Sequence, residues 1–166
     1  MFSTKRIDTR LGHFQKTFGL AGNEVRLLTT KQPKLITYNM EHVKLNTFSI
    51  KEEMGFGEKQ MKQLLLDVPK MWMMSQNSIL NRFDYVHKTM KISHEQILQM
   101  PKILTSRKFR IQQRHLFLEK LSRAQYNPKS ENYVSLEQLV AGTDSEFCAN
   151  VAKSSVQAYN TFLKSL

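Results

Sequence analysis

A short proline motif occurs three times along this chain, at intervals of 36 and 32 residues. Each copy is a Pro-Lys pair followed by two apolar residues. Intervals of this size indicate a stacked array of similar units, because one such unit is too small to bury its own apolar face. The sequence therefore predicts a repeat protein. The three copies are Gln32-Pro33-Lys34-Leu35-Ile36, Val68-Pro69-Lys70-Met71-Trp72 and Met100-Pro101-Lys102-Ile103-Leu104.

A second position repeats ahead of each proline. Gly19 and Gly55 lie 14 residues before the first two prolines, and Lys91 lies 10 residues before the third, in a shortened copy. Glycine is the usual residue just past a helix C-terminus, and the residue before a proline disfavours helix. Each repeat is thus expected to contain a first helix, a short second helix and a tight proline turn.

The apolar pattern places helices within these units. Ile7, Leu11, Phe14 and Phe18 form one stripe at helical spacing. We expect Asn23 to cap the second helix of the first repeat. In the third repeat Ser93 and Gln96 are expected to form a capping box, and in the last part of the chain Asp144 or Ser145 is expected to cap one final helix that runs to Leu166.

Strand signals are weak and short, so the predicted fold is all-α, a helical-repeat solenoid. Residues 1–166 are expected to form one domain, with repeats at 4–38, 39–75 and 76–105, then a fourth first helix at 109–121 and capping helices within 106–166. Lys5, Arg6 and Arg10 near the start resemble a transit peptide, but Asp8 and the direct entry into the first repeat favour a C-terminal piece of a longer array.

The net charge of +11 points to a polyanionic partner, with nucleic acid ahead of an acidic membrane surface. Residues 1–126 carry 22 Lys and Arg against 10 Asp and Glu, whereas residues 127–166 carry 3 against 4. The repeats are therefore the basic part, and the last 40 residues are expected to form a cap of little charge.

No pattern in the sequence indicates catalysis, a cofactor or a metal. The single cysteine, Cys148, has no neighbouring cation to favour a thiolate and fits a small buried residue. No apolar run approaches the roughly 18 residues that a membrane span needs. We predict a protein that is not an enzyme and not in a membrane. The five histidines lack metal-ligand spacing; they are His13, His42, His87, His94 and His115.

The candidate binding residues are cations in two sets. One set is concentrated between residues 102 and 123, where Arg110 and Arg114, four apart, are expected to share a helix face. The other consists of the lysines of the proline turns, which a solenoid would align into a row along a phosphate backbone. A solvated charged face is the alternative for both sets. The full list is Lys34, Lys70, Lys102, Arg107, Lys108, Arg110, Arg114 and Arg123.

Exposed aromatic side chains could stack on bases. Trp72, however, lies among three methionines and is expected to pack between repeats.

The repeat plan resembles the mitochondrial transcription termination factor (mTERF) family. Two helices closed by a proline turn, with a shortened copy, cover residues 4–105. The likeness continues through Arg114-His115-Leu116-Phe117-Leu118, Arg123-Ala124-Gln125-Tyr126, Tyr133-Val134-Ser135-Leu136, Phe147-Cys148 and Ala152-Lys153-Ser154-Ser155-Val156.

This resemblance implies a left-handed α-superhelix whose basic concave face holds double-stranded mitochondrial DNA in the mitochondrial matrix, and repression of transcription there. It also implies a link to mitochondrial ribosome assembly, and an N-terminal transit peptide and further repeats in full-length members. Two alternatives stay open: binding to ribosomal RNA, and a scaffold for other mitochondrial transcription or ribosome-assembly proteins that docks them on residues 127–166.

Overall fold

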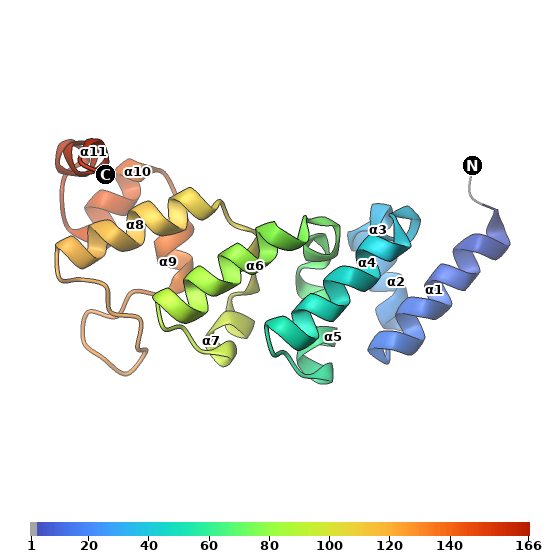
Figure 1. The fold of residues 1–166 in the computed structure, drawn as a ribbon. Helices are drawn as coiled ribbons and strands as arrows, with labels where there is room; N and C mark the ends of the chain where they lie inside the picture. The colour runs from blue at the N-terminus through green and yellow to red at the C-terminus, as the bar shows by residue number, and fades with distance from the viewer. Residues whose placement is uncertain (1–2) are drawn as a thin grey trace.

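The computed structural model describes residues 3–166, which form helices and connecting loops without a strand. Successive repeats follow one another along an elongated molecule, from the N-terminus at one end to the C-terminus near the other (Figure 1). The predicted all-α solenoid is confirmed. The first helices of the repeats are α1 (Thr4–Phe18), α4 (Met40–Phe48), α6 (Gln76–Asp84) and α8 (Lys108–Lys120).

Each of the first three repeats continues with a second helix and a single turn that begins at proline, as predicted. The proline supplies a fixed φ at the first position of its turn, where no backbone donor is needed. The second helices are α2 (Gly22–Lys31), α5 (Glu58–Asp67) and α7 (His94–Gln99). The turns are α3 (Pro33–Thr37), η2 (Pro69–Met73) and η4 (Pro101–Thr105), and they pack against one another in order.

A residue in the left-handed region ends the first helix of each repeat. Gly19 and Gly55 have φ of 63° and 78°, and Lys91 has 60°. In the second and third repeats, the helix widens into a π-helical turn just before this residue, at η1 (Ser49–Glu53) and η3 (Tyr85–Thr89). Backbone hydrogen bonds close each junction. The Phe56 N–H donates to Ile50 O at 3.2 Å, and the Ile92 N–H donates to Val86 O at 3.1 Å.

The same junction corrects the prediction of one final helix ending at Leu166. Helix α10 (Asp144–Phe147) passes into η5 (Cys148–Ala152), Lys153 turns left-handed with φ of 54°, and α11 (Val156–Lys164) follows. Apolar residues on both sides of Lys153 mimic one continuous helical stripe. The last part of the chain is therefore a further pair of repeat helices.

The fourth repeat, which begins with α8, departs from the plan of two helices and a proline turn. A loop follows α8, and α9 (Leu136–Val140) packs against both α8 and η4. It thus takes the place that a proline turn occupies in the other repeats.

Two of the predicted helix caps are wrong and one is confirmed. Ser93 accepts a bond from the Gln96 N–H at 3.2 Å, as predicted. Helix α2 begins at Gly22, one residue before Asn23, and its N-cap is Ala21, whose N–H donates to Glu24 Oε1 at 2.9 Å. Helix α10 is capped by Thr143 rather than by Asp144 or Ser145. In both cases a glutamate at the third helical position made an earlier start possible.

Trp72 packs between repeats, as predicted. Its side chain is fully buried, its indole meets the ring of Phe18 edge-on at 5.6 Å, and Nε1 donates to Thr47 Oγ1 at 3.0 Å. The buried apolar residues form one continuous cluster from Phe14 to Phe162. Stability is therefore shared along the array through contacts between neighbours.

A polar side chain from each first helix bonds to carbonyl groups at the end of the turn that closes the repeat. Arg10 donates to Ile36 O at 3.2 Å, and Asn46 donates to Trp72 O at 3.1 Å. The four positions are spaced by 36, 36 and 32 residues. These side chains satisfy turn carbonyls that have no partner within the turn. The full set is Arg10, Asn46, Arg82 and Arg114.

Candidate nucleic-acid interface

Helix α8 begins directly after the third proline turn and buries Ile111, Phe117 and Leu118. With these apolar side chains packed into the core, Arg107 and Phe109 at the start of the helix are exposed to solvent. Arg107 occupies the N-cap position, where its side chain makes no capping bond. The first backbone N–H groups of α8 therefore have no side-chain acceptor, a state that favours a bound anion.

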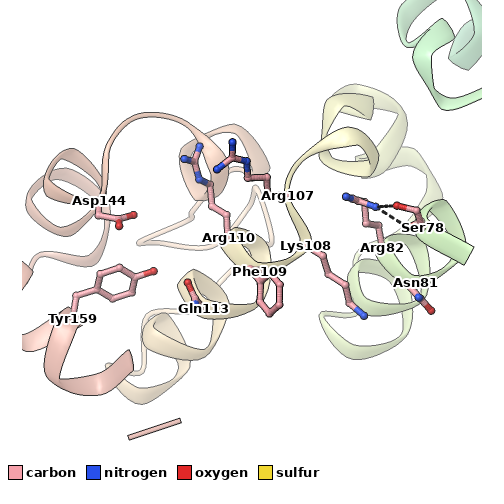
Figure 2. A pocket seen from close by; sticks show the side chains of 10 residues that line it. All are labelled: Ser78, Asn81, Arg82, Arg107, Lys108, Phe109, Arg110, Gln113, Asp144 and Tyr159. Carbon is pink, nitrogen blue, oxygen red and sulfur yellow. Dashed lines mark hydrogen bonds between the residues drawn. The ribbon is translucent and has the colours of Figure 1, made fainter. Parts of the chain in front are cut away.

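A pocket of about 570 Å³ lies at this end of α8 (Figure 2). Helix α6 forms one side of it, and Asp144 and Tyr159 line the opposite side. Among its charged residues, four are cations and only Asp144 is acidic. The residues are Ser78, Asn81, Arg82, Arg107, Lys108, Phe109, Arg110, Gln113, Asp144 and Tyr159.

The structure brings three of the predicted cations together here, and we call Arg107, Lys108 and Arg110 the α8 cations. Arg107 is exposed, and the other two are partly exposed. Arg110 Nη1 donates to Val140 O at 3.1 Å, which holds one edge of its guanidinium group against α9. Figure 2 shows Arg107 and Arg110 extending to the same side of α8. Guanidinium groups so placed suit bidentate contact with phosphate.

Arg82 is a fourth cation of the pocket, which the sequence interpretation missed. Its Nε donates to Ser106 O at 2.6 Å and its Nη1 to Ser78 O at 2.9 Å. Burial lowers the pKa of Arg82, although guanidinium stays charged at neutral pH. The repeat interval would have identified it, because Arg82 lies 32 residues before Arg114.

Arg114 bonds to α9 as Arg110 does, but Arg114 is fully buried, which counts against its predicted place among the binding residues. Its Nη1 donates to Leu139 O at 3.1 Å and Ala141 O at 2.7 Å. Its Nη2 donates to Gly142 O at 3.1 Å and to the Asp144 carboxylate at 3.0 Å. The guanidinium therefore fastens α9 and α10 to α8 and has no surface to offer a phosphate.

The remaining predicted cations lie elsewhere. Lys34, Lys70 and Lys102, the proline-turn lysines, are exposed at equivalent positions of the three stacked turns. Lys102 lines a different pocket, with Lys31, Asp67 and Glu137 among its neighbours. Arg123 is exposed beyond the C-terminal end of α8, away from the α8 cations. The eight predicted residues thus do not form one site.

The residues considered for other chemistry are occupied by packing. Burial raises the pKa of the Cys148 thiol, which disfavours the reactive thiolate. His87 Nδ1 lies 2.7 Å from Ile92 O, and His94 Nε2 lies 2.7 Å from Met54 O, so both rings donate to backbone at a repeat junction. Residues 3–166 contain no group of three or more His, Cys, Asp or Glu placed to hold a metal, and none of their helices is long and apolar enough to cross a membrane.

Comparison with known proteins gives a consistent result along the chain. The mTERF family model matches residues 1–148. "Transcription termination factor 3, mitochondrial" of Drosophila melanogaster is 46% identical over 164 residues, which cover 99% of this chain and 46% of that protein. The rat protein of the same name is 40% identical over 165 residues, 99% of this chain and 40% of its own length. Mouse "Transcription termination factor 4, mitochondrial" is 24% identical over 161 residues, 95% of this chain and 46% of that protein. The chain spans less than half the length of these relatives.

Proposed function

Since the chain belongs to the mTERF family, we propose that it is a nucleic-acid-binding regulator of mitochondrial transcription that holds double-stranded DNA against its basic repeats. The two relatives at 40–46% identity are named mitochondrial transcription termination factors, which supports the process and the organelle. The net charge of +11 supports a polyanionic partner. The family resemblance further implies that the protein, when bound to DNA in the mitochondrial matrix, represses transcription.

The observation that carries the proposal is the grouping of the α8 cations with Arg82 around one pocket. Hydrogen bonds from the guanidinium groups of Arg82 and Arg110 to backbone carbonyl groups hold both side chains in place, so less side-chain freedom is lost when a phosphate binds. The proline-turn lysines form a second, regularly spaced row. Contacts of this kind read the backbone of a duplex and carry little sequence preference.

The test is a salt titration of binding to a 20-bp DNA duplex. Six phosphate contacts, from the α8 cations and the proline-turn lysines, give log Kobs against log salt a slope of about −5, because each contact contributes about −0.9. Replacing the α8 cations with Gln should flatten the slope by about 3 units. Replacing the proline-turn lysines tests the second row in the same way.

A matched control separates local contacts from overall charge. Changing Lys51, Lys59 and Lys129 to Gln removes the same three charges from exposed positions outside the pocket. This control should leave the slope within about one contact of the unaltered protein. Equal slopes for all three triple variants would contradict a located binding surface, and no binding to DNA at low salt would overturn the proposal.

Duplex RNA of the same sequence, titrated alongside, decides between DNA and ribosomal RNA. Tighter binding to RNA at each salt concentration would move the protein to ribosome assembly. The scaffold alternative required a large exposed apolar patch on residues 127–166. In that segment the exposed large apolar side chains are Tyr133 and Leu166, 38% and 65% exposed. Two separate side chains make a small patch, which favours nucleic acid as the partner.

A further inference from the structure

One position on the first helices carries an amide side chain in the two repeats that form the pocket. It lies one residue before the polar side chain that fastens each first helix to carbonyl groups of its own repeat. Because those fastening side chains hold the four helices in equivalent orientations, the residues just before them point in equivalent directions. The residues at this position are Thr9, Leu45, Asn81 and Gln113.

Asn81 on α6 and Gln113 on α8 both line the pocket. Asn81 is exposed and Gln113 is partly exposed, and neither amide is hydrogen-bonded to another group in the part of the chain that the structure describes. Figure 2 shows the two side chains on their separate helices, with Lys108 and Phe109 between them. Neighbouring repeats thus present two available amides to the same surface.

An amide side chain is complementary to one base in particular. Its N–H donates to adenine N7 while its carbonyl oxygen accepts from the adenine N6 amino group, so two bonds form at once. Both adenine groups lie in the major groove of B-DNA, which is wide enough to admit an α-helix. The major groove of duplex RNA is too narrow for side chains to read. The two amides therefore suit adenines of duplex DNA.

The cations of the pocket can hold the duplex around these amides. Arg107 and Arg110 extend to one side of α8 and Lys108 to the other (Figure 2). Arg82 follows Asn81 on α6, and its bonds to Ser106 and Ser78 use Nε and Nη1, which leaves Nη2 for a phosphate. Phosphate contacts fix the position of a protein on DNA, and contacts to base edges then read the sequence.

We propose that Asn81 and Gln113 each read an adenine in the major groove of duplex DNA and give the protein a sequence preference beyond its phosphate contacts. The inference rests on the proposed function, since the cations must first hold a DNA duplex. Thr9 and Leu45, at the same position in the first two repeats, have no amide. The adenine preference therefore comes from the third and fourth repeats, and each amide specifies its own base pair.

The first experiment selects bound sequences from a pool of 20-bp DNA duplexes with a randomised centre. The unaltered protein should enrich A·T pairs at two positions, and changing either pair to G·C should weaken binding about ten-fold, as expected for a bidentate contact to adenine. Asn81→Ala should lose the enrichment at one position and Gln113→Ala at the other. Both side chains are accessible to solvent, so both variants should keep the circular dichroism and the salt slope of the unaltered protein.

The second experiment tests the atoms in contact. Replacing an enriched adenine with 7-deazaadenine removes the N7 acceptor and retains the base pair. This change should weaken binding of the unaltered protein about five-fold, the effect of one hydrogen bond, and should have no further effect on the variant that lacks the facing amide. Gln157→Ala and Asn160→Ala are the matched controls, because both residues are exposed on α11 outside the pocket, and both should leave the enrichment unchanged.

Steeply salt-dependent binding to DNA without any enriched position would overturn this inference and leave the proposed function standing. Enrichment that survives both pocket variants, or enriched adenines that tolerate 7-deazaadenine, would also overturn it. Absence of binding to any duplex at low salt would reject both proposals.

Discussion

Arg114→Met should destabilise the C-terminal part of the protein and leave the salt dependence of nucleic-acid binding unchanged. Methionine fills a similar volume but cannot donate, so the carbonyl groups of Leu139, Ala141 and Gly142 lose their common donor. The ring of Phe147 also loses the guanidinium that lies 4.7 Å from its centre. The change therefore separates a structural role from a phosphate contact.

The expected loss of stability in Arg114→Met depends on which of the three carbonyl groups water can reach. A hydrogen bond to a charged group contributes about 1.5–3 kcal/mol net. Leu139 is buried, so loss of the bond to its carbonyl group costs most of that free energy. Ala141 and Gly142 are exposed, so water can replace the donor there. The Asp144 side chain is 55% exposed, so that ion pair adds little. Together these give about 3 kcal/mol, the lower end of the range for breaking a buried charged interaction.

The assay is urea unfolding followed by helical circular dichroism, with thermal unfolding alongside. A loss of about 3 kcal/mol corresponds to a fall in Tm of roughly 6–12 °C for a chain of this size. Arg107→Met is the matched control, because Arg107 is exposed and the change should cost within about 0.5 kcal/mol. Arg107→Met should instead flatten the salt slope by about 0.9. If Arg114→Met unfolded like the unaltered protein and flattened the slope, the structural assignment of Arg114 would be refuted.

Two further predictions follow from backbone geometry and from burial. Lys153→Gly should stabilise the protein by about 1 kcal/mol in urea unfolding, because φ is 54° there and glycine adopts that conformation without strain. Gly55→Ala, at φ of 78°, should destabilise the protein by a similar amount. Equal unfolding midpoints for the two variants would contradict the junction geometry. Burial holds the pKa of His115 and of His13 below the ordinary 6.5, with Glu119 partly opposing this for His115. The unfolded chain then binds more protons below about pH 6.5, so stability is complete above that pH and falls as pH drops through it. His115→Gln should reduce the loss measured between pH 7.5 and 5.5, and an undiminished loss would exclude His115 as a source.

Part of the candidate site was predictable from sequence because it depends on neighbours in the chain. Arg107, Lys108 and Arg110 were identified from local charge density at the start of a helix, and they do line one pocket. Phe109 and Arg82 were missed. The signal for both was present in the repeat register, since Phe109 stands where other repeats have a polar residue, and Arg82 where they have Arg or Asn.

The sequence by itself determined the repeat, its helices and its turns. Proline removes a donor and fixes φ, and glycine permits a left-handed residue, so Pro33, Pro69, Gly19 and Gly55 mark boundaries wherever the rest of the chain lies. The excess of positive charge is likewise a property of the sequence alone.

Only the tertiary structure decided which cations are available to a ligand. Arg110 and Arg114 are four residues apart with the same charge, yet one reaches a pocket and the other is fully buried. The difference comes from α9 and the carbonyl groups around it, 25–28 residues further along, which fold back over Arg114. Helical spacing fixes the direction of a side chain from its own axis, whereas its exposure depends on the element that packs against that face.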